Sequence, residues 1–189
     1  MNRRIVLALG SAAALAALAA GPLRAQGGGA FTIAETGEAF ASLQEAVDAI
    51  GDESGTILIA PGRYGECAVQ EAGRVAYVAE EAGTALFDGG VCEGKATLVL
   101  RGRSARVEGL VFAHQSVEDG NGAGIRIEEG DLDVAFTLFR DAQCGILSAS
   151  DPSGTIRIDR STFSRLGNCE DPSGCAHSIY TGNYDQFEK

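Results

Sequence analysis

Apolar residues recur at three- and four-residue intervals early in the chain, which is the spacing of a helix with one buried face. The residues of this face are Phe40, Leu43, Val47 and Ile50. Ser42 and Glu45 have the spacing of a capping box, and Gly51 is a typical residue at a helix end. The pattern predicts a short amphipathic helix between Ser42 and Gly51.

A strand is predicted directly after this helix. Thr56–Ala60 is apolar and β-branched, and Pro61–Gly62 can turn the chain without supplying a ladder donor. A helix that leads into an apolar strand in this way is expected to cover the end of a structure made of strands.

Apolar, strand-like runs then return at intervals of roughly 20 to 30 residues, a period typical of solenoids. One series comprises Leu98–Arg101, Ile125–Glu128, Ile146–Ser148 and Ile179–Thr181. A second series ends in phenylalanine and comprises Val107–Phe112, Val134–Phe139 and Ile158–Phe163. Because such coils bury their apolar faces only against one another, the repeat predicts one stacked core.

Phenylalanines and glycines mark equivalent positions of these coils. Three phenylalanines at one phase predict an internal aromatic stack: Phe112, Phe139 and Phe163. Gly124 and Gly145 come just before strands of the first series, where we expect tight turns that require glycine. An antiparallel sandwich would need closer, hairpin-like spacing, for which only Asn121–Gly122 offers a turn.

The predicted helix and strand resemble the N-terminal cap and first coil of right-handed parallel β-helix proteins of the pectin-lyase-like superfamily. The matching residues are Leu43, Gln44, Ala46, Val47, Asp48 and Ala49 in the helix, then Pro61, Gly62, Tyr64 and Glu66 after the strand. The resemblance implies an all-β fold, a right-handed parallel β-helix (solenoid) with a short N-terminal capping α-helix. It implies little about chemistry, because the superfamily holds lyases, esterases, hydrolases and non-enzymatic members.

Residues 1–25 have the features of a secretory signal peptide: a basic start, an Ala/Leu-rich run and a short segment ending at Ala25. We therefore expect export to the periplasm or the extracellular space, with residues 26–189 forming one β-helix domain. No later segment is long and apolar enough to span a membrane. Residues 179–189 begin a further coil without a recognisable cap, so we interpret the chain as the N-terminal portion of a longer protein.

The predicted mature chain is strongly acidic. Removal of residues 1–25 takes Arg3, Arg4 and Arg24 from the 15 basic residues, which leaves 12 against 26 acidic residues and a net charge of −14. This charge argues against nucleic acid as a partner. It also opposes tight, metal-free binding of an acidic polysaccharide unless positive charge is concentrated locally or a cation bridges the two.

Five cysteines in an exported chain favour disulfides. The most economical pairing joins Cys67 to Cys92 on successive coils and Cys169 to Cys175 across a short loop. Cys144 is then left over. The alternative is that the cysteines are isolated buried thiols, and the loop around Cys169 has too few ligands for a zinc site.

Period-2 alternation along the first series predicts two outward columns of side chains. Arg126, Leu147 and Tyr180 form one, and Arg101, Glu128 and Ala149 form the next. His177 enters the same strand edge just before Tyr180. A cation, an aromatic ring and an imidazole on one groove suit a sugar, whose ring stacks on tyrosine and whose carboxylate meets arginine.

For catalysis, the resemblance permits β-elimination on a uronic-acid polymer. This reaction needs a neutraliser for the carboxylate, a base for the C5 proton and an acid for the leaving oxygen. Arg126 is the candidate neutraliser, His177 the base and Tyr180 the acid. The structural alternative for Arg126 is an ion pair with Glu128 or Glu108. For His177 it is a loop-anchoring hydrogen bond, and for Tyr180 an exposed place on a strand.

Calcium is the candidate cofactor, with Asp119 and Asn121 supplying oxygen ligands. The alternative for Glu118–Asn121 is an acidic turn of the Asx type, because the spacing matches neither an EF-hand nor the calcium-binding nonapeptide. His114 is interpreted as a residue at a coil corner.

Two hypotheses of function follow. In the first, the protein binds or cleaves an extracytoplasmic polysaccharide in the predicted groove. In the second, it is a non-catalytic solenoid whose outward residues serve solubility and partner docking. The first predicts that Arg126, His177 and Tyr180 cluster in one concave groove, and the second that they are dispersed or paired with other groups.

Overall fold

The computed structural model describes residues 29–167, 177–182 and 186–188, which form an all-β fold with one short helix, α1 (Leu43–Ile50). The first sheet contains β1 (Phe31–Ile33), β2 (Ala39–Phe40), β3 (Ser54–Ile59), β6 (Arg74–Ala79), β9 (Ser104–Glu108), β12 (Asp131–Ala135), β15 (Thr155–Asp159) and β18 (Gln186–Glu188). The second contains β4 (Gly62–Tyr64), β7 (Ala85–Asp88), β10 (Val111–Ala113), β13 (Leu138–Arg140) and β16 (Thr162–Ser164). The third contains β5 (Ala68–Gln70), β8 (Ala96–Leu100), β11 (Ala123–Ile127), β14 (Cys144–Ser148) and β17 (Ile179–Tyr180).

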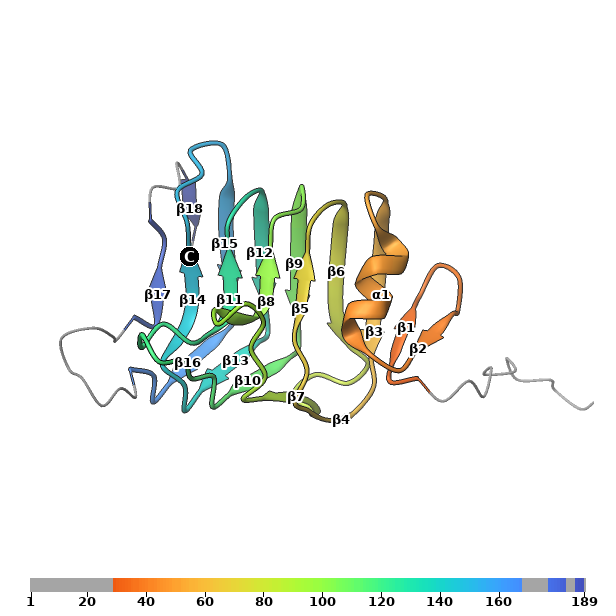
Figure 1. The fold of residues 1–189 in the computed structure, drawn as a ribbon, viewed down its shortest axis with the longest axis horizontal. Coiled ribbons are helices and arrows are strands. Elements are labelled where there is room, and N and C mark those ends of the chain that lie inside the picture. The colour runs from red at the N-terminus through yellow and green to blue at the C-terminus, as the bar shows by residue number, and fades with distance from the viewer. Residues whose placement is uncertain (1–28, 168–176, 183–185, 189) are drawn as a thin grey trace, which may run out of the picture.

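Each strand pairs with the equivalent strand one coil away. A coil runs from the third sheet to the first and then to the second, as in β8, β9 and β10, and the strands of successive coils pair in parallel. Only β1 pairs antiparallel, with β2 and β3, among the described strands. Figure 1 shows the coils side by side along one axis, with α1, β1 and β2 at one end. The parallel stacking is consistent with a β-solenoid and contradicts the alternative of an antiparallel sandwich.

The predicted helix is confirmed by α1. The Ser42 hydroxyl accepts a hydrogen bond from the Glu45 amide, and the Glu45 carboxylate accepts one from the Ser42 amide, so the capping box is complete. Gly51 ends the helix with φ of 59°. Leu43 and Val47 are buried, which places the apolar face of α1 against the first coil.

The first series of predicted strands is confirmed in the third sheet, where Ile125 pairs with both Leu98 and Ile146. The second series is wrong in one respect, because each predicted strand is two strands that lie in different sheets. The chain turns a corner inside each run, at Gly109, Phe136 and Arg160, all of which have positive φ. Alternation of side chains gives no sign of such a corner, because the residues on both sides of it point into the same core.

The predicted aromatic stack is confirmed and is longer than expected. It runs through Phe31, Tyr64, Phe87, Phe112, Phe139 and Phe163, with ring centroids 4.8–5.7 Å apart. The rings of Phe112, Phe139 and Phe163 are stacked nearly parallel to one another, with interplanar angles of 11° and 7°. The stack therefore forms a continuous line of contacts between coils that are distant in sequence.

Gly124 and Gly145 do not form turns. Both lie inside strands, β11 and β14, with ordinary φ values. A Cβ at Gly124 would lie 2.7 Å from the Phe139 ring, and one at Gly145 would lie 2.8 Å from the Phe163 ring and 2.5 Å from the Ser178 carbonyl oxygen. Glycine is needed at these positions because the aromatic stack passes next to the strand backbone.

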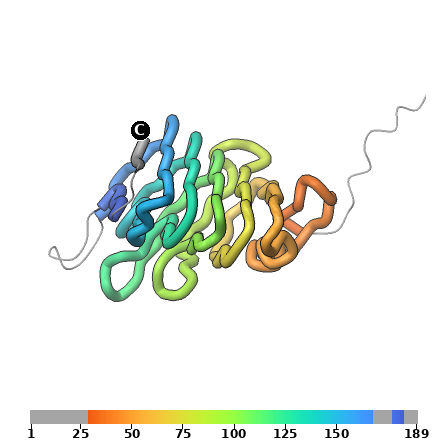
Figure 2. Tube along the Cα trace, turned by 90° about the horizontal axis from the view of Figure 1, so that it is seen from above, coloured from red at the N-terminus to blue at the C-terminus, as the bar shows by residue number. Residues whose placement is uncertain are grey.

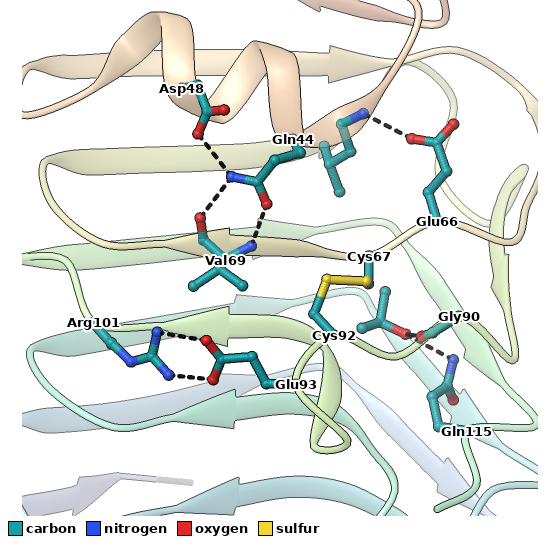
Figure 3. The surroundings of a disulfide bond; sticks show 12 residues. Gln44, Asp48, Glu66, Cys67, Val69, Gly90, Cys92, Glu93, Arg101 and Gln115 are labelled. Carbon is teal, nitrogen blue, oxygen red and sulfur yellow. Dashed lines mark hydrogen bonds and ion pairs between the residues drawn. A yellow bond between two sulfur atoms is a disulfide. The ribbon is translucent and has the colours of Figure 1, made fainter.

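The disulfide between Cys67 and Cys92 is confirmed, with Cα atoms 5.5 Å apart. It joins successive coils, as Figure 3 shows. The Cys144 thiol is buried and lies 4.0 Å from the Gly120 carbonyl oxygen. The pair Cys169–Cys175 and the predicted signal peptide lie outside the described residues. In the described ranges, α1 is too short to cross a membrane, and no other helix is found.

Candidate functional site

The outward face of the third sheet carries the predicted column of side chains. Arg126 pairs with Leu147, which pairs in turn with Tyr180, so these three residues occupy one register position of β11, β14 and β17. The loop that precedes β11 brings Asp119 and Asn121 beside the column, and Figure 2 shows loops that project from this stack of coils. Strands and loops together form a groove.

A cavity of about 500 Å³ lies in this groove. It is lined by Gly94, Lys95, Asp119, Asn121, Arg126, Leu147, His177 and Tyr180. The structure thus brings together every residue that the sequence suggested for catalysis or metal binding. Their roles remain predictions, since the clustering shows only that the groups can act on one ligand.

The His177 and Tyr180 rings form one wall of the cavity. Their centroids are 5.2 Å apart and the planes are inclined by 44°. Tyr180 is 50% exposed, and His177 is exposed as well. An exposed tyrosine ring offers a flat apolar face with a polar tip, which is the geometry that stacks on a sugar ring.

Arg126 is the least engaged cation at this site. Its Nε lies 3.6 Å from Glu128 Oε1, and this buried nitrogen has no hydrogen-bond partner among the described residues. The Glu128 carboxylate already accepts hydrogen bonds from Lys95 Nζ at 2.9 Å and from Arg101 Nε at 2.7 Å. The ion pair expected between Arg126 and Glu128 is therefore a charge contact without a directed hydrogen bond, and Glu108 pairs instead with Arg106.

Arg101 links this network to two more carboxylates. Its guanidinium donates hydrogen bonds to Glu71 Oε1 at 2.8 Å and to both carboxylate oxygens of Glu93. Figure 3 shows the contact between Arg101 and Glu93. Hydrogen bonds from Arg101 and Lys95 lower the pKa of Glu93 to about 2. Burial alone would raise the pKa of Glu128, but Lys95 and Arg101 outweigh it and hold that pKa below its usual value. The Glu93 and Glu128 carboxylates are thus ionised at neutral pH.

The charges of the network balance. Three cations, Lys95, Arg101 and Arg126, face the three carboxylates of Glu71, Glu93 and Glu128. Because Lys95 and Arg101 hold all three carboxylates, the guanidinium of Arg126 keeps the largest unused hydrogen-bonding capacity.

The calcium prediction finds little support in this geometry. Asp119 Oδ1 accepts a hydrogen bond from the Asn121 amide at 3.0 Å, as in an Asx turn. Calcium takes six to eight oxygen ligands, and within the described ranges no group of three or more His, Cys, Asp and Glu side chains could hold a metal ion. Asp119 and Asn121 alone do not fit the ion, so no step below is derived through it.

No family model, curated protein or solved structure matches this chain. What this groove can bind is therefore inferred from the chemistry of its own side chains. Two residues that line the groove, Gly94 and Lys95, were not predicted from the sequence. Lys95 precedes β8 as Gly122 precedes β11, so continuing the predicted alignment of Leu98 with Ile125 backward by three residues would have placed it beside the groove.

Gln143 holds the loop that carries Asp119. It is almost fully buried, its Oε1 accepts hydrogen bonds from the amides of Val117 and Gly122 at 2.9 and 2.8 Å, and its Nε2 donates to the Val117 carbonyl at 3.0 Å. One side chain thus ties both ends of the loop. This tether sets the shape of the groove wall on the side of β11.

Gln143→Leu is expected to loosen this loop without unfolding the coils. Two buried amides lose their acceptor, at a cost of about 2 kcal/mol, so the exchange of the Val117 and Gly122 amide hydrogens should accelerate roughly 30-fold. Gln44→Leu is the matched control, because Gln44 holds Val69 by the same pair of bonds, at 2.7 and 3.0 Å. The control should accelerate exchange at Val69 and leave the loop unchanged. Equal effects of the two variants on the loop would contradict the tether.

Proposed function

We propose that the chain is a right-handed parallel β-helix of the pectin-lyase-like type, exported, and that its groove binds an extracytoplasmic acidic polysaccharide. The observation that carries the proposal is the unpartnered Arg126 Nε in a cavity next to the half-exposed ring of Tyr180. A uronate residue would place its carboxylate on Arg126 and its ring on Tyr180. The groove network has no net positive charge to offset the acidic chain, so binding would depend on the hydrogen-bonding capacity that Arg126 has left.

The catalytic form of this proposal is β-elimination. His177 would take the proton from C5 of the uronate, the bond between C4 and the glycosidic oxygen would break, and Tyr180 would give its proton to that oxygen. A double bond forms between C4 and C5, so atoms and charges balance. Arg126 would neutralise the carboxylate and so stabilise the negative charge that develops during proton removal. This step depends on the resemblance as well as on the clustering.

The test uses fragments of oligogalacturonate, oligoalginate and hyaluronan. Calorimetry measures their binding, and ultraviolet absorbance measures any unsaturated uronate that forms. Arg126→Gln should weaken binding roughly 10- to 150-fold, since a charge-assisted hydrogen bond is worth about 1.5–3 kcal/mol. Arg106→Gln is the control, because Arg106 lies on the first sheet, away from the groove, in an exposed ion pair with Glu108. It should change the affinity less than twofold.

His177→Ala separates binding from elimination. If the protein is a lyase, the rise in absorbance disappears in this variant while binding persists. If the parent protein binds a polymer but the absorbance does not rise, the protein is a polysaccharide-binding module and not a lyase. Absence of binding to all three polymers would overturn the proposal and favour the non-catalytic solenoid.

A further inference from the structure

A second cluster of charged side chains lies at the corner where the chain leaves the second sheet. The residues that follow β7, β10, β13 and β16 are Gly89, His114, Asp141 and Arg165, and all four have positive φ. Because these strands pair in register, the four residues stack one coil apart. A backbone with positive φ favours glycine, as at Gly89. The equivalent position of each of the next three coils nevertheless carries an ionisable side chain.

Asp88 and His114 form the first half of this corner cluster. His114 Nδ1 lies 2.6 Å from Asp88 Oδ1, and the Asp88 side chain is only 9% exposed. The other oxygen, Oδ2, lies against the Arg63 guanidinium in an ion pair rather than a well-directed hydrogen bond. Burial would raise the pKa of Asp88, but His114 and Arg63 outweigh it and lower that pKa. An ionised Asp88 fixes a proton on Nδ1 and leaves Nε2 to face other groups.

Asp141 forms the second half. Its carboxylate accepts hydrogen bonds from Arg140 at 2.7 Å and from Arg165 at 2.5 and 2.8 Å. These two guanidinium groups hold the pKa of Asp141 far below its usual range. His114, Asp141 and Arg165 line one cavity of about 500 Å³ together with Leu166 and Gly167. The two halves therefore face a common space.

The corner cluster carries an excess of positive charge. Arg63, Arg140 and Arg165 face two carboxylates, Asp88 and Asp141, so the cluster has a net charge of +1 with a neutral imidazole and +2 with a protonated one. The groove network, by contrast, balances three cations against three carboxylates. The charged groups that line the cavity itself are Asp141 and Arg165, beside His114, and the excess comes from Arg63 and Arg140 elsewhere in the cluster. On a chain with a formal net charge of −11, the cluster as a whole is a local positive region that favours an anion.

We propose that the corner cavity is a second binding site that takes a single anionic group, a carboxylate, sulfate or phosphate, with Arg165 and His114 as its ligands. Arg165 supplies the guanidinium at the mouth of the cavity, and protonated His114 adds a donor through Nε2, which makes no hydrogen bond to a described residue. The charged groups that surround His114 are Arg63 from β4, Asp88 from β7, and Asp141 and Arg165 from the next coils.

The imidazole signals of His114 and His177 can be followed separately by NMR, because the chain has only two histidines. The probes are inorganic sulfate, inorganic phosphate and monomeric galacturonate, each compared with chloride at matched ionic strength. We expect a saturable shift of the His114 signal, and comparison of the three probes identifies the preferred anion. The inference does not depend on the groove, because a polysaccharide bound there is reported by His177.

Arg165→Gln should weaken this binding roughly tenfold. Arg160→Gln is the matched control. Arg160 is an exposed residue with positive φ that pairs with Asp159. It lies at the corner before β16, whereas Arg165 lies at the corner after it. His114→Gln should also weaken the binding, measured by calorimetry, because a neutral amide replaces the imidazolium donor. No saturable shift with any probe, or an equal affinity in Arg165→Gln, would overturn the proposal.

Discussion

Phe139→Ala is expected to lower the free energy of unfolding by about 4 kcal/mol. The Phe139 ring is 1% exposed and lies between Phe112 and Phe163, with centroid distances of 5.1 and 4.8 Å. Its removal leaves a cavity in the middle of the stack and breaks two ring contacts. Gly124, whose hydrogen faces this ring, cannot fill the space.

Phe136→Ala is the matched control for this prediction. Phe136 lies three residues earlier, is 46% exposed and contacts the Arg160 guanidinium at 4.2 Å from the ring centroid. Loss of an exposed cation–π contact costs about 0.5–1 kcal/mol. Urea unfolding of both variants measures the difference. Similar losses in the two variants would contradict the assignment of the stack as the main link between these coils.

The phase of the aromatic stack was predictable because Phe112, Phe139 and Phe163 end runs of similar length and pattern. The stack's continuation to Phe87 and Tyr64 was missed because residues 80–84 separate β6 from β7, whereas only residues 109–110 separate β9 from β10, and because Pro61 and Gly62 interrupt the run that ends at Tyr64. When the length of a repeat varies from coil to coil, the first coils cannot be aligned with the later ones by sequence pattern. The packing nevertheless continues through them.

The glycines show a second limit of sequence interpretation. Gly124 was assigned to a turn because glycine usually serves a local backbone need. Its actual cause is the Phe139 ring, which lies on β13, two strands later in the same coil. A close approach between strands of different sheets leaves no mark in the sequence next to the glycine, so only the assembled fold shows why a side chain is excluded.

The groove was predictable to a greater degree than the corner cavity. Alternation and register place Arg126, Leu147 and Tyr180 in one column, because strands of the third sheet align without insertions. His114 was interpreted only as a corner residue. Its partner Asp88 lies 26 positions earlier in the chain, and the corners are preceded and followed by segments of unequal length, which obscures their alignment.

Removal of the disulfide is expected to lower the free energy of unfolding by about 3 kcal/mol, the value for closure of a loop of this size in the unfolded chain. Cys67 and Cys92 are separated by 25 positions. The measurement is urea unfolding of a Cys67→Ala/Cys92→Ala double variant beside the parent protein. Cys144→Ala is the control, because Cys144 is buried in another coil and takes no part in this disulfide.

The same change should loosen the helix cap. Glu66, next to Cys67, accepts a hydrogen bond from the Leu43 amide at 2.8 Å, and Gln44 holds Val69 on the following strand, as Figure 3 shows. The disulfide thus fixes the segment on which α1 is anchored. In the double variant, amide exchange at Leu43 and Val69 should accelerate more than exchange at Ile125, which lies two coils further along the stack. A uniform acceleration would mean that the disulfide acts only through the unfolded chain, whereas a graded one shows that it also holds the cap in the folded state.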